Sequence, residues 1–82
     1  MKESDPFAEV YRSYHQSVLR AVGRIAPDAD TAEDWAQEAW IRILRGLSTF
    51  EGRAALGTWI HRVAFTTAIS LYRRDRRRLH LR

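Results

Sequence analysis

An 82-residue chain with 45% hydrophobic residues, 29% charged residues and a net charge of +4 has the composition of one small globular domain. It is too apolar for an open coil, and its lack of cysteine excludes a disulfide framework, a thiolate metal site and a thiol nucleophile. Its longest stretch without a charged residue covers the ten positions 63–72, about half the length that a bilayer-spanning helix needs.

The first predicted element is a helix over about residues 6–25. Asp5-Pro6 is typical of a helix start, because proline is tolerated in the first helical turn. Proline cannot continue a helix and disfavours a helical residue before it, so Pro27 marks the end. Between these points apolar residues recur at three- and four-residue steps and form one stripe: Phe7, Val10, Tyr11, Tyr14, Val18, Ala21, Val22 and Ile25.

A second helix is predicted over about residues 31–45. Asp30 with Glu33, or Thr31 with Asp34, resembles a capping box at its start, and Gly46 is the expected C-terminal cap. Its buried face is predicted from the same periodicity: Ala32, Trp35, Ala36, Ala39, Trp40, Ile43 and Leu44.

After a loop in which Gly52 allows a turn, a third helix is predicted over about residues 55–78. Its inward stripe contains Leu56, Trp59, Ile60, Val63, Ala64, Thr67, Ala68, Leu71 and Tyr72. No strand-like alternation, repeat or low-complexity linker occurs along the chain. The sequence therefore predicts an all-α fold, a compact three-helix bundle with a long C-terminal helix, as a single domain over residues 1–82.

The second predicted helix keeps a polar strip opposite its apolar face. A solvated face would explain the charges of this strip, but it does not explain Ile41, an aliphatic residue between Glu38 and Arg45. A small apolar centre within a charged rim is typical of a protein-binding surface. The strip is therefore a candidate site for a protein partner, and its members are Asp34, Gln37, Glu38, Ile41, Arg42 and Arg45.

Basic residues are concentrated in the last part of the chain. Residues 1–51 sum to −3, whereas residues 52–82 carry eight arginines and one acid and sum to +7. On the outer face of the third helix Phe65 and Ile69 interrupt these arginines, and arginines beside an aromatic ring are typical of single-strand binding. A further packing surface for the first helix would explain the same apolar residues, and periodicity does not decide between the two.

Two sequence motifs lie on these two faces. The pattern A-E-D-x-x-Q-E-x-(aromatic) is matched by Ala32-Glu33-Asp34, Gln37-Glu38 and Trp40. After a loop with Phe50 and Gly52, the pattern T-W-(aliphatic)-x-R-(aliphatic)-A is matched by Thr58-Trp59-Ile60, Arg62 and Val63-Ala64. At this separation the two motifs resemble region 2 of bacterial sigma factors of the extracytoplasmic-function type, within the sigma-70 family. The resemblance covers about residues 7–78.

The resemblance implies a cytoplasmic transcription initiation factor domain, without cofactor, metal or catalytic group, that binds core RNA polymerase and recognises and melts the promoter −10 element. In that family the second helix binds the clamp helices of the polymerase largest subunit, which assigns this role to the polar strip. The third helix and its preceding loop capture the melted non-template strand and flip one base into a loop pocket. The matching positions are Phe50, Arg53, Arg62, Phe65, Thr66, Ile69 and Arg73, with phosphate contacts added by Arg74, Arg76 and Arg77. Anti-sigma factors commonly bind this domain in relatives, so an anti-sigma factor is a further candidate partner.

The chain departs from the family pattern in two respects. Many relatives have R-N-x-x-x-D after the T-W motif, where this chain has Phe65-Thr66 and ends the run with Ser70, so the base preference of the pocket is not carried over. These factors also carry a second DNA-binding domain, region 4, for the −35 element. Nothing in the 82 residues corresponds to region 4, so we expect an excised domain of a longer protein.

Two other functions stay open at this point. A helix-turn-helix reader of duplex DNA needs a short turn before its recognition helix, and the connection from Gly46 to Ala55 is long for that motif. A protein-interaction bundle with a solubilising basic tail would bind a partner without DNA. An enzyme is disfavoured because His15, His61 and His80 are scattered, and no H-E-x-x-H motif or phosphate-cradling glycine loop occurs.

Overall fold

The computed structural model describes residues 5–52 and 55–80, with side chains up to Arg76 in the last helix. These residues form three α-helices: α1, Pro6–Gly23, α2, Ala29–Leu47, and α3, Leu56–His80. Each helix packs against the other two, and the described part of the chain contains no strand. The predicted all-α bundle with a long C-terminal helix is confirmed.

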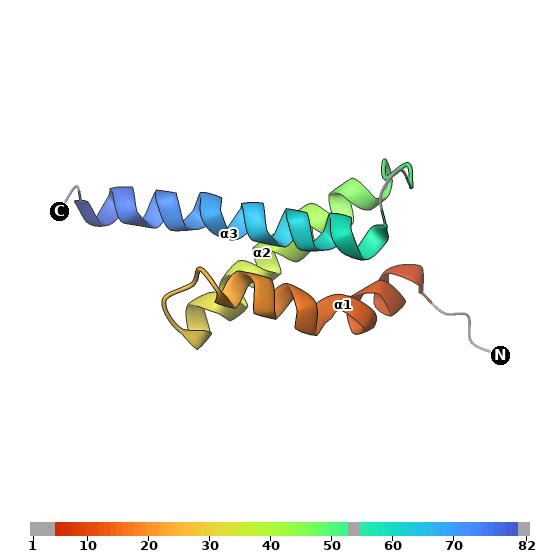
Figure 1. Cartoon of the computed structure of the whole chain (residues 1–82), viewed down its shortest axis with the longest axis horizontal. Helices are drawn as coiled ribbons and strands as arrows, with labels where there is room; N and C mark the ends of the chain where they lie inside the picture. The colour runs from red at the N-terminus through yellow and green to blue at the C-terminus, as the bar shows by residue number, and fades with distance from the viewer. Residues whose placement is uncertain (1–4, 53–54, 81–82) are drawn as a thin grey trace.

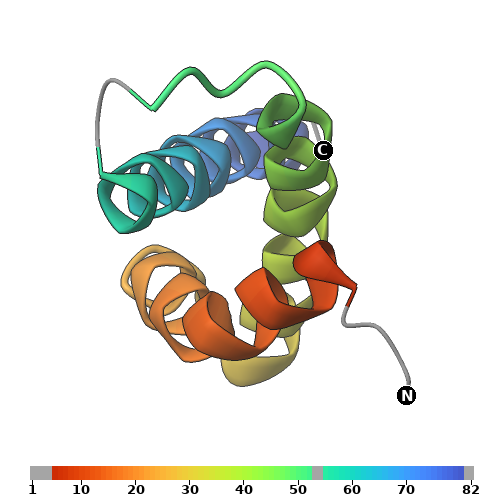
Figure 2. The same ribbon diagram turned by 90° about the vertical axis from the view of Figure 1, so that its right-hand side faces the viewer.

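The three helices are arranged around one shared interior. Seen end-on, α1 and α3 lie on one side of the molecule and α2 on the other (Figure 2). Because α3 is the longest helix, its C-terminal turns extend past the ends of α1 and α2 (Figure 1). The C-terminal end of α2 lies near the start of α3, at the opposite end of α3 from these turns (Figure 1).

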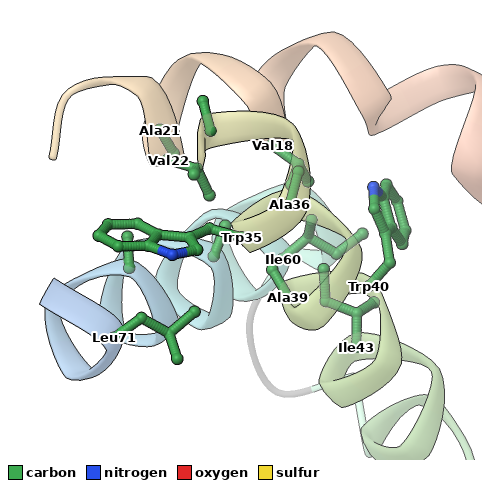
Figure 3. Close-up of a cluster of buried hydrophobic side chains, with 13 residues drawn as sticks. Val18, Ala21, Val22, Trp35, Ala36, Ala39, Trp40, Ile43, Ile60 and Leu71 are labelled. Atoms are coloured by element: carbon green, nitrogen blue, oxygen red, sulfur yellow. The ribbon is translucent and has the colours of Figure 1, made fainter. Parts of the chain in front are cut away.

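Apolar side chains from all three helices fill the interior. Figure 3 shows Trp35 and Trp40 at opposite ends of the cluster, with Ala36 and Ile60 between them. Full burial of a side chain the size of Ile60 contributes about 1.5–3 kcal/mol, and the many alanines let the helix backbones approach closely. The buried residues are Val18, Ala21, Val22, Ala32, Trp35, Ala36, Ala39, Trp40, Ile43, Ile60, Ala64, Ala68 and Leu71.

Aspartate side chains cap the starts of α1 and α2. Asp5 accepts a hydrogen bond from the backbone N–H of Phe7 at 3.1 Å, with Pro6 in the first helical position as expected. Asp28 accepts one from the N–H of Thr31 at 2.8 Å, and this bond holds the pKa of Asp28 below its usual value. The prediction that Asp30 or Thr31 caps α2 was wrong, because α2 already begins at Ala29 and Asp28 is its N-cap.

The ends of α1 and α2 also differ from the predicted ends. α1 stops at Gly23 rather than near residue 25, and Ile25 and Ala26 donate to the carbonyl of Val22 in the turn that leads to Pro27. Gly46 is not the cap of α2, since the helix continues to Leu47 and Ser48 is the cap. A Cβ at Gly46 would lie 2.7 Å from the Trp59 ring, so glycine is needed there for close packing. The predicted turn at Gly52 is confirmed by its φ of +78°.

Three residues that periodicity assigned to buried stripes lie on the surface. Tyr11 is 38% exposed, Leu44 is 49% exposed and Tyr72 is 41% exposed. Tyr72 follows Leu71, the last core residue of α3, so it lies where the helix leaves the bundle. Tyr11 and Leu44 lie at the edges of their stripes, where a groove separates α1 from α2.

Candidate functional site

The polar strip of α2 lies on the surface, as its members' exposure shows. Glu38 is half-buried, and the other five residues of the strip are exposed. Ile41 leaves 44% of its surface in contact with solvent. The structure therefore brings the six residues together on one accessible side of α2, with an aliphatic side chain among the charges.

One row of the strip faces α3. Arg42 Nη1 donates to Thr67 Oγ1 at 3.5 Å, and Arg42 Nε pairs with Glu38 Oε2 at 3.6 Å. Thr67 is only 1% exposed, so Arg42 supplies a partner to a buried hydroxyl of α3. Arg42 thus connects α2 to α3 as well as lying in the strip.

The other row of the strip borders a groove between α1 and α2. The groove has a volume of about 530 Å³, and Gln37 and Ile41 lie along its α2 side. Its remaining lining is mainly apolar and aromatic: Phe7, Tyr11, His15, Leu19, Glu33, Ala36, Trp40 and Leu44. Sequence reasoning missed this groove, although the spacing of Gln37, Ile41 and Leu44 along one helical row is a signal that could have found its α2 edge.

Ring contacts hold the aromatic side of the groove in place. Trp40 Nε1 donates to His15 Nδ1 at 3.3 Å, and the Tyr11 hydroxyl lies 3.4 Å from His15 Nε2. The Tyr11 and His15 rings stack with their centroids 4.5 Å apart. Because His15 Nδ1 accepts the indole proton, the hydrogen of the neutral imidazole belongs on Nε2, facing Tyr11.

In the loop before α3, Phe50 packs against the first turns of that helix. Its ring centroid lies 5.1 Å from that of Trp59, and both side chains are half-buried. The loop aromatic is therefore attached to α3 through Trp59, and part of its surface stays accessible. Arg53, a predicted DNA-binding residue, lies outside the described residues.

The outer face of α3 is basic, as predicted. Phe65 and Ile69 are half-buried beside it, and the exposed members are Arg62, Thr66, Arg73, Arg74 and Arg76. A hollow of about 510 Å³ lies along the helix between Thr66 and Arg74. Two arginines also have contacts within α3: Arg74 pairs with Asp75 at 3.2 Å, and Arg76 lies 5.9 Å from the ring centroid of Tyr72. The side chain of Arg77 is not among the described ones.

Thr66 uses its hydroxyl proton inside α3. Its Oγ1 donates to the carbonyl of Arg62 at 2.8 Å and lies 3.2 Å from that of Val63. The oxygen lone pairs remain directed away from these bonds, so Thr66 offers an external partner an acceptor.

Within residues 5–52 and 55–80, no group of three or more His, Asp or Glu side chains is placed to hold a metal ion. No helix of the described part has both the length and the apolar composition to cross a membrane.

Comparisons with known proteins identify the family. The Sigma-70 region 2 family model matches residues 10–78. The chain is 37% identical over 75 residues to RNA polymerase sigma factor YlaC of Bacillus subtilis strain 168, covering 92% of this chain and 43% of YlaC. It is 34% identical over 71 residues to ECF RNA polymerase sigma factor SigX of the same organism, covering 87% of this chain and 37% of SigX. With the RNA polymerase sigma-H factor of Pseudomonas aeruginosa it shares 42% identity over 55 residues, which cover 67% of this chain and 28% of that protein.

The chain thus spans less than half the length of each of these relatives. No solved structure matches it. The family model covers most of the three-helix bundle, including both candidate surfaces from Asp34 to Arg76. The chain belongs to the Sigma-70 region 2 family.

Proposed function

We propose that this domain acts in transcription initiation by binding core RNA polymerase through α2 and the promoter −10 element through α3 and the loop before it. The observation that carries the proposal is that α2 and α3 expose two surfaces of different chemistry. α2 presents mixed charges around Ile41, whereas α3 presents arginines around Phe65 and Ile69. The proposal places the domain in the cytoplasm, where the polymerase acts.

The α2 surface suits a helical protein partner. Ile41 and Leu44 are 44% and 49% exposed and lie beside the groove along α1, which provides a concave apolar centre. On its α3 side this apolar centre is bordered by charged residues of the strip: Asp34 and Glu38, which line a hollow together with Arg74, and Arg45. Burial of a small apolar centre within a polar rim is the usual arrangement of a protein–protein interface. We assign this surface to the clamp helices of the polymerase largest subunit.

The α3 surface suits a single DNA strand. Arg62 and Arg73 are exposed on the outer side of the helix, where they contact phosphates and set the position of the strand. Phe65 supplies an apolar ring on which an unpaired base stacks. Such contacts offset the cost of unstacking a base, which is a few kcal/mol. Phe50, held on Trp59, brings the loop next to this strand.

The α2–α3 connection argues against a helix-turn-helix duplex reader. α2 ends at Leu47 and α3 begins at Leu56, so residues 48–55 separate the two helices. A helix-turn-helix motif joins its helices by a turn of about three or four residues. The protein-interaction bundle, the other alternative, is an outcome of the experiment below.

The test separates the two surfaces by mutation. One variant replaces Gln37 and Ile41 by alanine, and the other replaces Arg62 and Arg73 by alanine. Both variants should fold, because all four side chains are exposed. Binding to core RNA polymerase is measured by fluorescence anisotropy, and so is binding to single-stranded and duplex −10 oligonucleotides. We expect the first variant to lose polymerase binding alone and the second to lose DNA binding alone.

Salt dependence gives a second readout of the DNA surface. The logarithm of the single-strand affinity should fall with the logarithm of salt concentration with a slope of about −0.7 for each phosphate contacted. A preference for duplex over single-stranded −10 DNA would contradict strand capture. Salt-insensitive polymerase binding without any DNA binding would favour the protein-interaction bundle.

A further inference from the structure

Phe65 has an aromatic neighbour one helical turn earlier on α3, His61. The two rings are nearly parallel, with an angle of 6° between their planes and 6.5 Å between their centroids. His61 is exposed and Phe65 is half-buried. The proposed function so far assigns no role to His61.

The distance between these two ring centroids is close to the distance between two rings that have one base stacked between them. Neighbouring bases in DNA lie about 3.4 Å apart, so two rings with a base between them lie about 6.8 Å apart. The Tyr11–His15 pair on α1 has the same four-residue spacing, but its centroids are 4.5 Å apart and its polar atoms are in contact at 3.4 Å. The Tyr11 and His15 rings are thus in direct contact, whereas the centroids of the parallel His61 and Phe65 rings are 6.5 Å apart.

The charges around the pair favour a nucleic acid strand as the occupant. Arg62 follows His61 and is exposed, and Arg73 continues the basic face further along α3. α3 contains no acidic residue before Asp75, so no like charge repels a phosphate along this part of the helix. Ile69, one turn after Phe65, extends the apolar surface in the same direction.

We propose that an unpaired base of single-stranded DNA inserts between the rings of His61 and Phe65. This inference rests on the proposed function and deepens it, because it adds His61 as a binding residue and places a second base-stacking position on α3, apart from the loop around Phe50. Stacking on a π-face is tolerant of sequence, so this position contributes affinity rather than base choice.

The test compares two single-stranded oligonucleotides of equal length, one carrying bases and one with abasic sites at its central positions. The full chain and the variants His61→Leu and Phe65→Leu are titrated with both. Leucine keeps an apolar side chain and good helix propensity but removes the π-face. We expect each variant to bind the base-carrying strand about ten-fold more weakly, and the abasic strand as wild type does.

A further variant and a fluorescence signal complete the experiment. His61→Phe should keep the wild-type affinity, because it keeps a ring at this position. With 2-aminopurine at the central position, wild type should quench the fluorescence by stacking, and the two α3 leucine variants should not.

The inference is overturned if His61→Leu and Phe65→Leu bind the base-carrying strand like wild type. It is also overturned if they weaken binding to both strands equally, because the lost contact would then not involve a base. In either case salt-dependent single-strand binding by wild type would leave the proposed function standing. Absence of single-strand binding by wild type would overturn both.

Discussion

The indole of Trp59 lies over Gly46 so closely that a Cβ on the glycine would be 2.7 Å from the nearest ring atom, Cζ2. Gly46 belongs to the last turn of α2 and Trp59 to the beginning of α3, so this contact joins the two helices beside the loop that connects them. The ring of Phe50, from within the loop, packs on the same indole at 5.1 Å.

Replacement of Gly46 by alanine should destabilise the domain. Alanine favours a helix over glycine by about 1 kcal/mol, but the added methyl group would overlap the Trp59 ring, and overpacking typically costs about 1–3 kcal/mol. We therefore expect a net loss in the free energy of unfolding, measured by urea denaturation. Gly23→Ala is the matched control, because no atom lies within 4 Å of its added Cβ. Equal stability of the two variants would contradict close packing at Gly46.

The hydrogen bond from Arg42 to Thr67 predicts a coupling between α2 and α3. Arg42→Leu should leave the buried Thr67 hydroxyl without its partner and lower the free energy of unfolding by about 1 kcal/mol. Thr67→Val removes the hydroxyl itself, so adding it to Arg42→Leu should cause little further loss. Denaturant melts of the two single variants and the double variant give the coupling energy. Simple additivity would show that the two side chains do not interact.

Thr66 predicts a specific kind of base contact, if α3 holds the strand as proposed. Because its proton is used by helix carbonyls, the hydroxyl accepts hydrogen bonds and discriminates in favour of a base that donates one. Thr66→Val keeps the branched shape and removes the acceptor, so the spread of affinities across four single-base variants of a −10 strand should narrow by several-fold. The salt dependence should stay as in wild type. An unchanged spread would show that Thr66 does not contact a base.

The Asp28 cap makes the stability of α2 depend on pH. The bond from Thr31 lowers the pKa of Asp28 below 3.8 in the folded state, so its stabilising contribution is complete above pH 3.8 and is lost as the pH falls through the lowered pKa. Asp28→Ala should melt at a lower temperature than wild type at pH 7, and the difference should shrink in strong acid. Asp30→Ala, next to the start of α2, should have the smaller effect at neutral pH. If Asp30→Ala lowered the melting temperature more than Asp28→Ala does, Asp30 rather than Asp28 would be the residue that caps α2.

Apolar periodicity predicted the interior well because the buried stripes follow the helical repeat. Gly46 shows where such local reasoning fails. A glycine near the end of a helix has the same local sequence signal whether it caps the helix or receives a neighbouring ring, and Trp59, which decides the matter, lies 13 positions later. Leu44 and Tyr11 were assigned to the interior for a similar reason, since periodicity does not show how far α1 and α2 separate at the edge of a stripe.

The sequence was sufficient to predict which residues form the polar strip, but it was not sufficient to predict which parts of α1 and α3 they contact. Arg42 and Gln37 belong to the same polar strip in the sequence. In the structure, however, Arg42 reaches α3, whereas Gln37 borders the groove along α1. That division depends on which helix packs on each side of α2. The direction of the Thr66 proton and the parallel arrangement of the His61 and Phe65 rings likewise depend on rotamers, which sequence spacing does not determine.

The turns of α3 beyond Leu71 have a thermodynamic consequence of their own. They contribute no further described residue to the core, and Arg73, Arg74 and Arg76 follow one another there with Arg77 and Arg78. Like charges one turn apart repel and weaken a helix, and a short helical segment without tertiary packing is marginal in water. Bound phosphates would reduce that repulsion and stabilise the helical conformation of these turns. If α3 binds DNA as proposed, part of the binding free energy is therefore used to form these turns.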